Sequence, residues 1–279
     1  MKNILLPTDF SKNSIGAINY AMQLLKDEAC HFYILNVQKA SSFITDDLMV
    51  VNSSATVYKT LIDASKKSME NIVLSIKKKF KNSKHEFHTI VDYDNFVDSI
   101  NQVCSNQDID LIIMGTHGAS GLEKVFFGSN TAHVMQRSKT PVLAIPHGYK
   151  FTKLDAIAFT TSNLTFFKIK DLMALKYLVK YHRAKLNILH VADEQSAQNQ
   201  ALNEGFFQVY FNDANNELVN LNGKDVFDVI HDYIKNHDIK MLAMMNKKHS
   251  FLERLFTRHP VETFAFKIDI PLLVMHKNN

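Results

Sequence analysis

The hydrophobic residues of this chain come in short apolar runs separated by longer amphipathic segments. The runs are typical of strands buried on both faces of a parallel sheet. In the segments between them, apolar residues recur every three or four positions, which predicts helices packed on that sheet. Strands and helices alternating in this way favour an α/β fold. The predicted strands are 3–8, 31–37, 84–91, 109–115 and 141–146, and the helices are about 11–27, 55–81, 94–105 and 129–136.

The same pattern starts again in the second half. From Asp225 onward the second half aligns with the first without a gap, at a shift of 130 residues, so an internal duplication covers most of the chain. We expect two tandem Rossmann-like domains, residues 1–148 and 153–279, each with a mostly parallel five-stranded sheet flanked by helices. The strands expected in the second half are 156–162, 186–191, 217–221 and 271–276, with a helix at about 196–213.

Glycine is concentrated in one place. The chain of 279 residues has only eight glycines, and four of them are Gly115, Gly118, Gly121 and Gly128. They lie between a predicted buried strand and a predicted helix. A strand, a glycine loop and a helix start together point bare backbone N–H groups and a helix dipole at an anion, usually phosphate. A tight strand-to-helix connection with no ligand is the alternative.

The spacing Gly115-x2-Gly118-x9-Gly128-Ser129 is neither a dinucleotide fingerprint nor a Walker loop. It resembles the nucleotide loop of the universal stress protein family. Two further segments resemble that family in order and spacing, Ile4-Leu-Leu-Pro-Thr-Asp-Phe-Ser11 and Tyr33-Ile-Leu-Asn-Val37.

The resemblance implies that the first domain binds an adenine nucleotide, ATP or AMP, with or without Mg or Mn. In such a site the backbone of Val37 meets the adenine ring. Asp9 follows the carboxyl end of a strand, where ligands of open parallel sheets bind; a carboxylate there suits a ribose hydroxyl, and helix capping is its alternative role. The candidate cofactor-binding residues are Pro7, Thr8, Asp9, Val37, Met114, Gly115, Gly118, Gly128, Ser129, Asn130 and Thr131.

Catalytic machinery is hard to find in the same region. No lysine follows the last glycine, and no pair of acidic residues is placed to hold magnesium as in P-loop enzymes. We therefore predict no catalytic residue and favour a regulatory, stress-response nucleotide-binding protein over an enzyme. The alternatives are a slow ATPase or phosphotransferase that uses Asp9 or His117, and a partner-binding protein with a remnant pocket.

The second half has lost the residues of this site, which predicts one nucleotide per chain. Side chains replace the glycines, and a basic cluster takes the place of the loop; a solvated loop is the simpler interpretation of that cluster, and an anion site is the alternative. In the sequence alignment Gly115, Gly118, Gly128, Ser129 and Asp9 become Met245, Lys248, Arg258, His259 and Thr161, and the cluster comprises Lys247, Lys248, His249, Arg254, Arg258 and His259.

Composition narrows the class of protein further. Cys30 and Cys104 form no CxxC pair, which fits a reducing compartment. The sequence has no apolar run long enough for a membrane span and no signal-peptide pattern, so we expect a cytoplasmic protein. The net charge of +4 is small, and the lysines of 77–84 are expected to end a helix rather than to bind nucleic acid.

Two further expectations concern a pair of histidines and the last strand of each sheet. His85 and His88 lie three apart on a predicted strand, so they face opposite sides and zinc binding by that pair is not expected.

Strands 141–146 and 271–276 come last in the two sheets and are expected to be edge strands. Proteins of the family dimerise through this strand, so we expect the two domains to pair within one chain; a further homodimer stays open.

Overall fold

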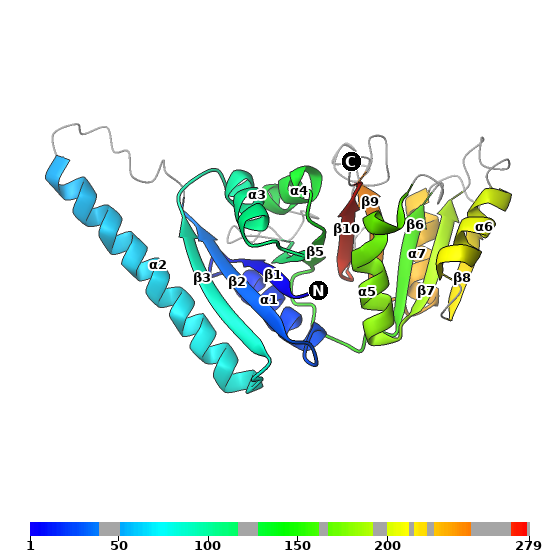
Figure 1. Cartoon of the computed structure of the whole chain (residues 1–279), viewed down its shortest axis with the longest axis horizontal. Helices are drawn as coiled ribbons and strands as arrows, with labels where there is room; N and C mark the ends of the chain where they lie inside the picture. The colour runs from blue at the N-terminus through cyan, green and yellow to red at the C-terminus, as the bar shows by residue number, and fades with distance from the viewer. Residues whose placement is uncertain are drawn as a thin grey trace. The chain divides into compact units, whose positions relative to one another are not determined.

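The computed structural model describes residues 1–38, 51–116, 128–161, 167–191, 200–211, 215–221, 226–246 and 269–277. By its internal contacts the chain divides into two compact units, Met1–Thr140 and Pro141–Asn279. Each unit is an α/β structure with strands and helices in alternation (Figure 1). This is the predicted fold class.

The first unit holds four parallel strands in the order β3-β2-β1-β4. The apolar runs that predicted these strands are buried; Ile4, Leu5 and Leu6 of β1 have no exposed surface. In order along the chain the elements are β1 (Asn3–Pro7), α1 (Lys12–Leu24), β2 (Cys30–Val37), α2 (Val51–Phe80), β3 (His85–Asp92), α3 (Phe96–Asn106), β4 (Leu111–Gly115) and α4 (Ser129–Arg137).

The second unit repeats that strand order and adds two strands. Its sheet runs β5-β10-β9-β6-β7-β8, in which β6 is flanked by β7 and β9 as β1 is flanked by β2 and β4. The helix at 173–182 is an element that the sequence pattern did not single out. The elements are β5 (Val142–Ile145), β6 (Ala156–Thr161), η3 (Ile169–Leu172), α5 (Met173–His182), β7 (Lys185–Val191), α6 (Gln200–Phe211), β8 (Asn216–Leu221), α7 (Val226–Asn236), β9 (Met241–Asn246) and β10 (Leu272–His276).

Strand β5 pairs with β10 in antiparallel orientation, with Leu273 opposite Leu143. The sequence predicted pairing between these two strands, and the structure shows it. Because of this pairing β5 groups by contacts with the second unit, so the division lies between Thr140 and Pro141. The sequence placed the boundary a few residues later, after β5.

Helix α2 ends with Lys77, Lys78 and Lys79 in its last turn, as predicted. Cations at that position complement the negative end of the helix dipole. No helix among the described residues is both long and apolar enough to cross a membrane.

Candidate functional site

The candidate site lies at the carboxyl ends of β1, β2 and β4. From β1 the chain proceeds through β2 to β3 on one side, and then returns to β4 on the other side of β1. The carboxyl ends of β1 and β4 therefore flank the point where the strand order reverses. In open parallel sheets that point is where ligands bind.

The turn after β1 is held by its own side chains. Thr8 is buried, and its Oγ1 lies 2.9 Å from Ser14 Oγ and accepts from Phe10 N at 3.0 Å. Asp9 is exposed, and its Oδ1 accepts from Ser11 N at 3.0 Å. Phe10 adopts a left-handed conformation with φ 63°, unusual for a bulky residue.

The N-cap of α1 is Ser11, whose side chain accepts from Ser14 N. Capping was the alternative role for Asp9, and Ser11 performs it instead. The Asp9 carboxylate closes a local turn and stays exposed at the end of β1. Residues in rare backbone conformations cluster at functional sites, so the left-handed Phe10 beside Asp9 is consistent with a site here.

Val37 is the last residue of β2, and its backbone faces the β1 side. Leu35 O accepts from Thr8 N, whereas Gln38 N donates to Asp92 O of β3. Backbone groups of a strand alternate in direction, so the N–H and C=O of Val37 point the same way as those of Leu35. Strand β1 ends at Pro7, opposite Leu35, so the Val37 groups face the space beyond that end.

Both ends of the glycine loop are tied together at the base. Gly128 N donates to Thr116 O at 2.6 Å, and Thr131 Oγ1 donates to Gly115 O at 2.8 Å. The Thr131 hydroxyl is buried and its one proton is used in this bond, so its side chain fixes α4 against β4. What Thr131 can offer a phosphate is its backbone N–H.

Gly115 has a structural reason to be glycine. A Cβ built there would lie 2.4 Å from Asn13 Nδ2 and 3.1 Å from Asn13 O, because α1 packs closely on the end of β4. Real Cβ atoms essentially never come within 3.0 Å of another heavy atom, so the Asn13 side chain would have to move. This glycine is therefore explained by helix packing before any ligand is considered.

Gly128 is different. It is the N-cap of α4 with φ −57° and ψ 150°, a conformation that any residue adopts, so the backbone does not require glycine. N-caps favour Ser, Thr, Asp or Asn because their side chains satisfy free N–H groups of the first turn. Glycine makes no such side-chain bond here. The first-turn N–H groups can therefore meet an external anion.

The remaining predicted residues divide into two groups. Pro7 and Met114 are buried at the ends of β1 and β4, whereas Ser129 and Asn130 are exposed in the first turn of α4. Gly118, Gly121 and His117 lie outside the described residues.

The second unit corrects one equivalence drawn from the sequence. Asp110 N donates to Asn3 O at 2.9 Å, and Lys240 N donates to Ala156 O at 2.9 Å. At the shift of 130 residues Lys240 corresponds to Asp110, so Ala156 corresponds to Asn3.

Thr161 is therefore the counterpart of Thr8, and Asp9 corresponds to Ser162 and not to Thr161 as the sequence alignment had it. The sequence alone missed this by one residue because the two strands differ too much to fix the register. Serine is uncharged, so the conclusion that the second unit lacks the carboxylate is unchanged. Ser162 itself lies outside the described residues.

At the end of β9 the second unit has a side chain where the first unit has a glycine. Met245, the counterpart of Gly115, is a buried strand residue that pairs with Met275. The counterparts of the other loop glycines, Lys248 and Arg258, lie outside the described residues, as do the rest of the basic cluster.

The two cysteines offer no nucleophile. Both are free and buried. Burial raises the pKa of the Cys30 thiol to about 11, and it does the same for Cys104. A thiol with so high a pKa is protonated at neutral pH and is unreactive.

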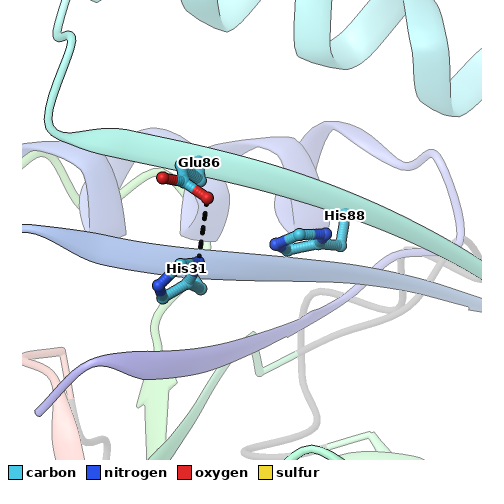
Figure 2. A group of neighbouring side chains, drawn as sticks. All are labelled: His31, Glu86 and His88. Atoms are coloured by element: carbon cyan, nitrogen blue, oxygen red, sulfur yellow. Dashed lines mark ion pairs between the residues drawn. The ribbon is translucent and has the colours of Figure 1, made fainter.

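One cluster was missed by the sequence reasoning. His31 of β2 lies beside Glu86 and His88 of β3, all on one face of the sheet (Figure 2). His85 is buried on the opposite face, as predicted for residues three apart on a strand. The predicted absence of zinc concerned the pair His85 and His88; the neighbouring strand was not considered, and no sequence signal links it to β3.

Comparison with known proteins supplies independent information. The model of the Universal stress protein family matches residues 1–146. Universal stress protein MJ0577 of Methanocaldococcus jannaschii is 27% identical over 156 residues, which cover 52% of this chain and 94% of that protein. Universal stress protein MJ0531 of the same organism is 26% identical over 144 residues, 52% of this chain and 81% of that protein.

A similar structure spans both units. The crystal structure of a universal stress protein from Archaeoglobus fulgidus matches with a TM-score of 0.71 at 18% identity, over 99% of this chain and 98% of that chain. At this identity the likeness establishes the fold and leaves the ligand open.

Proposed function

Because the chain belongs to the universal stress protein family, we propose that its first domain, residues 1–148, binds an adenine nucleotide, ATP or AMP, and that the protein acts as a regulatory nucleotide-binding protein in a stress response. The observation that carries the proposal is Gly128. It caps α4 without a side chain in a conformation that does not need glycine, so the first turn of the helix is left for an anion.

Three neighbouring strand ends supply the other contacts. The phosphates lie on the backbone of Gly115, Gly118 and Gly128 and on the first turn of α4, where Ser129 and Asn130 add side chains. The backbone of Val37 meets the adenine ring. Asp9 binds the ribose hydroxyls. A carboxylate is favourable there because it would repel the phosphate oxygens if it lay beside them.

Other predicted residues position this site. The hydroxyl groups of Thr8 and Thr131 are used in bonds within the protein, so they fix the turn after β1 and the start of α4. Pro7 and Met114 line its floor. A metal ion, Mg or Mn, would be bound by the phosphates and not by protein side chains, because Asp9 is the one carboxylate among the candidate residues.

We propose that the second domain, residues 153–279, is a degenerate copy from a tandem duplication. The same order of β6, β7, β8 and β9 supports the duplication, and the buried Met245 and the loss of the carboxylate support the degeneracy. Pairing of β5 with β10 supports the expectation that strands from the two halves of the sequence meet within one chain.

Denaturing the purified protein and chromatographing the released small molecules tests the proposal directly. We expect an adenine nucleotide, about one per chain. Titration calorimetry with ATP and AMP then gives the affinity, and turnover assays with Mg²⁺ or Mn²⁺ separate binding from slow hydrolysis. A chain that releases no nucleotide and binds neither ATP nor AMP contradicts the proposal and favours a remnant pocket.

A further inference from the structure

The cluster of His31, Glu86 and His88 brings three metal-ligating side chains together on adjacent strands. His31 lies opposite Glu86 in the pairing of β2 with β3, and His88 is two residues further along β3 on the same face. One ligand atom from each residue lies within 4.8 Å of the other two. His31 Nδ1 and Glu86 Oε2 are already 3.2 Å apart (Figure 2).

These distances are close to those of a bound ion. Ligand atoms about 2.1 Å from a tetrahedral zinc ion lie about 3.4 Å from each other. The pair of His31 and Glu86 meets that spacing, and His88 reaches it by a movement on the order of 1 Å. His88 and Glu86 are exposed, so their side chains can make this movement without disturbing the core.

The three ligands are carried by rigid elements. The ring of His88 stacks on Tyr33 of β2, with centroids 4.8 Å apart and an interplanar angle of 21°. It is also stacked against His31, with centroids 5.8 Å apart. The two imidazoles therefore approach from neighbouring strands with their planes nearly aligned, which limits the entropy lost when an ion binds both.

Fold stability does not explain the arrangement. An ion pair between His31 and Glu86, whose side chains are 43% and 67% exposed, contributes little in water. In the second unit a lysine and a glutamate occupy the positions that correspond to His31 and His88.

Lys185 N donates to Asp155 O as His31 N donates to Lys2 O, so Lys185 is the counterpart of His31. Lys185 Nζ forms an ion pair with Glu217 at 2.7 Å, and that hydrogen bond raises the pKa of Lys185. Glu217 lies opposite Asn187, the counterpart of Tyr33, so it stands in the place of His88 and not of Glu86. A protonated lysine cannot bind a metal, so the second unit has an ion pair here and lacks the site.

We propose that His31, Glu86 and His88 form a binding site for a divalent transition-metal ion of the zinc class, with water completing the coordination. Two imidazoles and one carboxylate with an open position match the ligand set of open zinc sites. Imidazole also suits Ni²⁺ and Cu²⁺, whereas Mg²⁺, Ca²⁺ and Mn²⁺ prefer oxygen.

This site is separate from the proposed nucleotide site. His31 stands near the start of β2 and Val37 at its end, about 20 Å apart at about 3.3 Å per residue. The inference therefore does not depend on nucleotide binding.

Calorimetric titration of the metal-free full-length protein with ZnCl₂ tests the proposal. Because the chain has thirteen histidines, the quantity that tests the site is the difference in bound zinc between the wild type and each variant. We expect His31→Lys, which reproduces the residue of the second unit and keeps a partner for Glu86, to lose one zinc equivalent. His88→Gln is expected to lose the same equivalent or to weaken it by at least about tenfold.

His237→Gln is the matched control. His237 is an exposed histidine of the second unit, and its loss is expected to leave the zinc titration unchanged. Titrations with MgCl₂ are expected to give the same result for the wild type and for His31→Lys.

Thermal unfolding provides a second measurement. An ion that joins β2 to β3 binds only the folded chain, so ZnCl₂ is expected to raise the Tm of the wild type and to raise it less in His31→Lys and His88→Gln. If both variants titrate and unfold with ZnCl₂ as the wild type does, the three residues do not bind the ion and the proposal is wrong.

Discussion

The ends of β4 and β9 are the most instructive comparison within this chain. Strand β4 lies beside β1 and β9 lies beside β6, the counterpart of β1, and the residues of both strands are buried apart from the last residue of β9. At one position β4 has Gly115 and β9 has Met245. The glycine leaves room for Asn13 of α1, whereas the methionine fills its own space inside the second sheet. One fold therefore accepts either residue, and the neighbouring elements decide which one fits.

The comparison separates two kinds of glycine. Gly115 is explained by packing, and its loss in the second unit does not by itself show that a ligand has been lost. The backbone conformation of Gly128 does not require glycine, and the residue stands at the start of a helix. The functional argument therefore depends on Gly128 more than on Gly115, although the two belong to one sequence motif.

The largest effect is expected from Gly128→Val. The new side chain covers the first-turn N–H groups of α4, each of which can form a strong hydrogen bond to phosphate. We expect ATP affinity to fall by more than about 100-fold in a folded protein. Calorimetry measures the affinity and circular dichroism the fold.

Gly205→Val is the control for Gly128→Val. Gly205 is an exposed residue of α6 with nothing within 4 Å of an added Cβ, so ATP affinity is expected to stay the same. Unchanged ATP binding by Gly128→Val would remove the phosphate cradle from the proposed function.

Gly115→Ala is expected to act on stability. The added Cβ collides with the Asn13 side chain, which is buried, and we expect the free energy of unfolding to fall by about 1–3 kcal/mol. Urea denaturation measures it. Adding Asn13→Ala to Gly115→Ala removes the closest contact and is expected to recover part of the loss relative to Asn13→Ala alone. An additive result in this double-mutant cycle contradicts the packing explanation.

Asp9→Ser converts the first unit to the residue of the second. Losing the hydrogen bond that a ribose hydroxyl donates to the Asp9 carboxylate is expected to lower ATP affinity by about tenfold. Serine keeps an oxygen acceptor for Ser11 N, so the turn is expected to stay intact. The sharper measurement compares ATP with its 2′- and 3′-deoxy analogues: the wild type is expected to discriminate against them and Asp9→Ser is not. Equal discrimination by both proteins would place Asp9 away from the ribose.

The smallest effect concerns His85, the buried first residue of β3. Burial lowers the pKa of His85 from the ordinary imidazole value, although Nε2 lies 3.1 Å from Leu25 O. The unfolded chain then binds this proton more readily than the folded chain does. Stability is therefore full above about pH 6.5 and declines as the pH falls below it.

Urea denaturation between about pH 8 and pH 5 measures this decline. His85→Gln, whose amide can still donate to Leu25 O, is expected to show a shallower decline than the wild type. Equal slopes for wild type and His85→Gln mean that His85 is not the group responsible.

Much of the fold was predictable from the sequence because it depends on local patterns. Buried strands appear as apolar runs and helices as amphipathic segments, so β1, α1, β2 and β4 were placed to within a few residues. The spacing of Gly115, Gly118 and Gly128 identified the candidate loop, and the missing glycines of the second half distinguished the two domains. None of these features requires knowledge of which segments become neighbours.

Only the tertiary structure decided the features that depend on contacts between distant segments. The packing of Asn13 against Gly115, the correspondence of Thr161 with Thr8, and the meeting of His31 with Glu86 and His88 are all of this kind. Strand register is set by hydrogen bonds between segments far apart in the chain, and shifting it by one residue turns every side chain to the other face. A periodic pattern along one strand does not contain that information, because it describes which face is buried and not which residue of the next strand lies opposite.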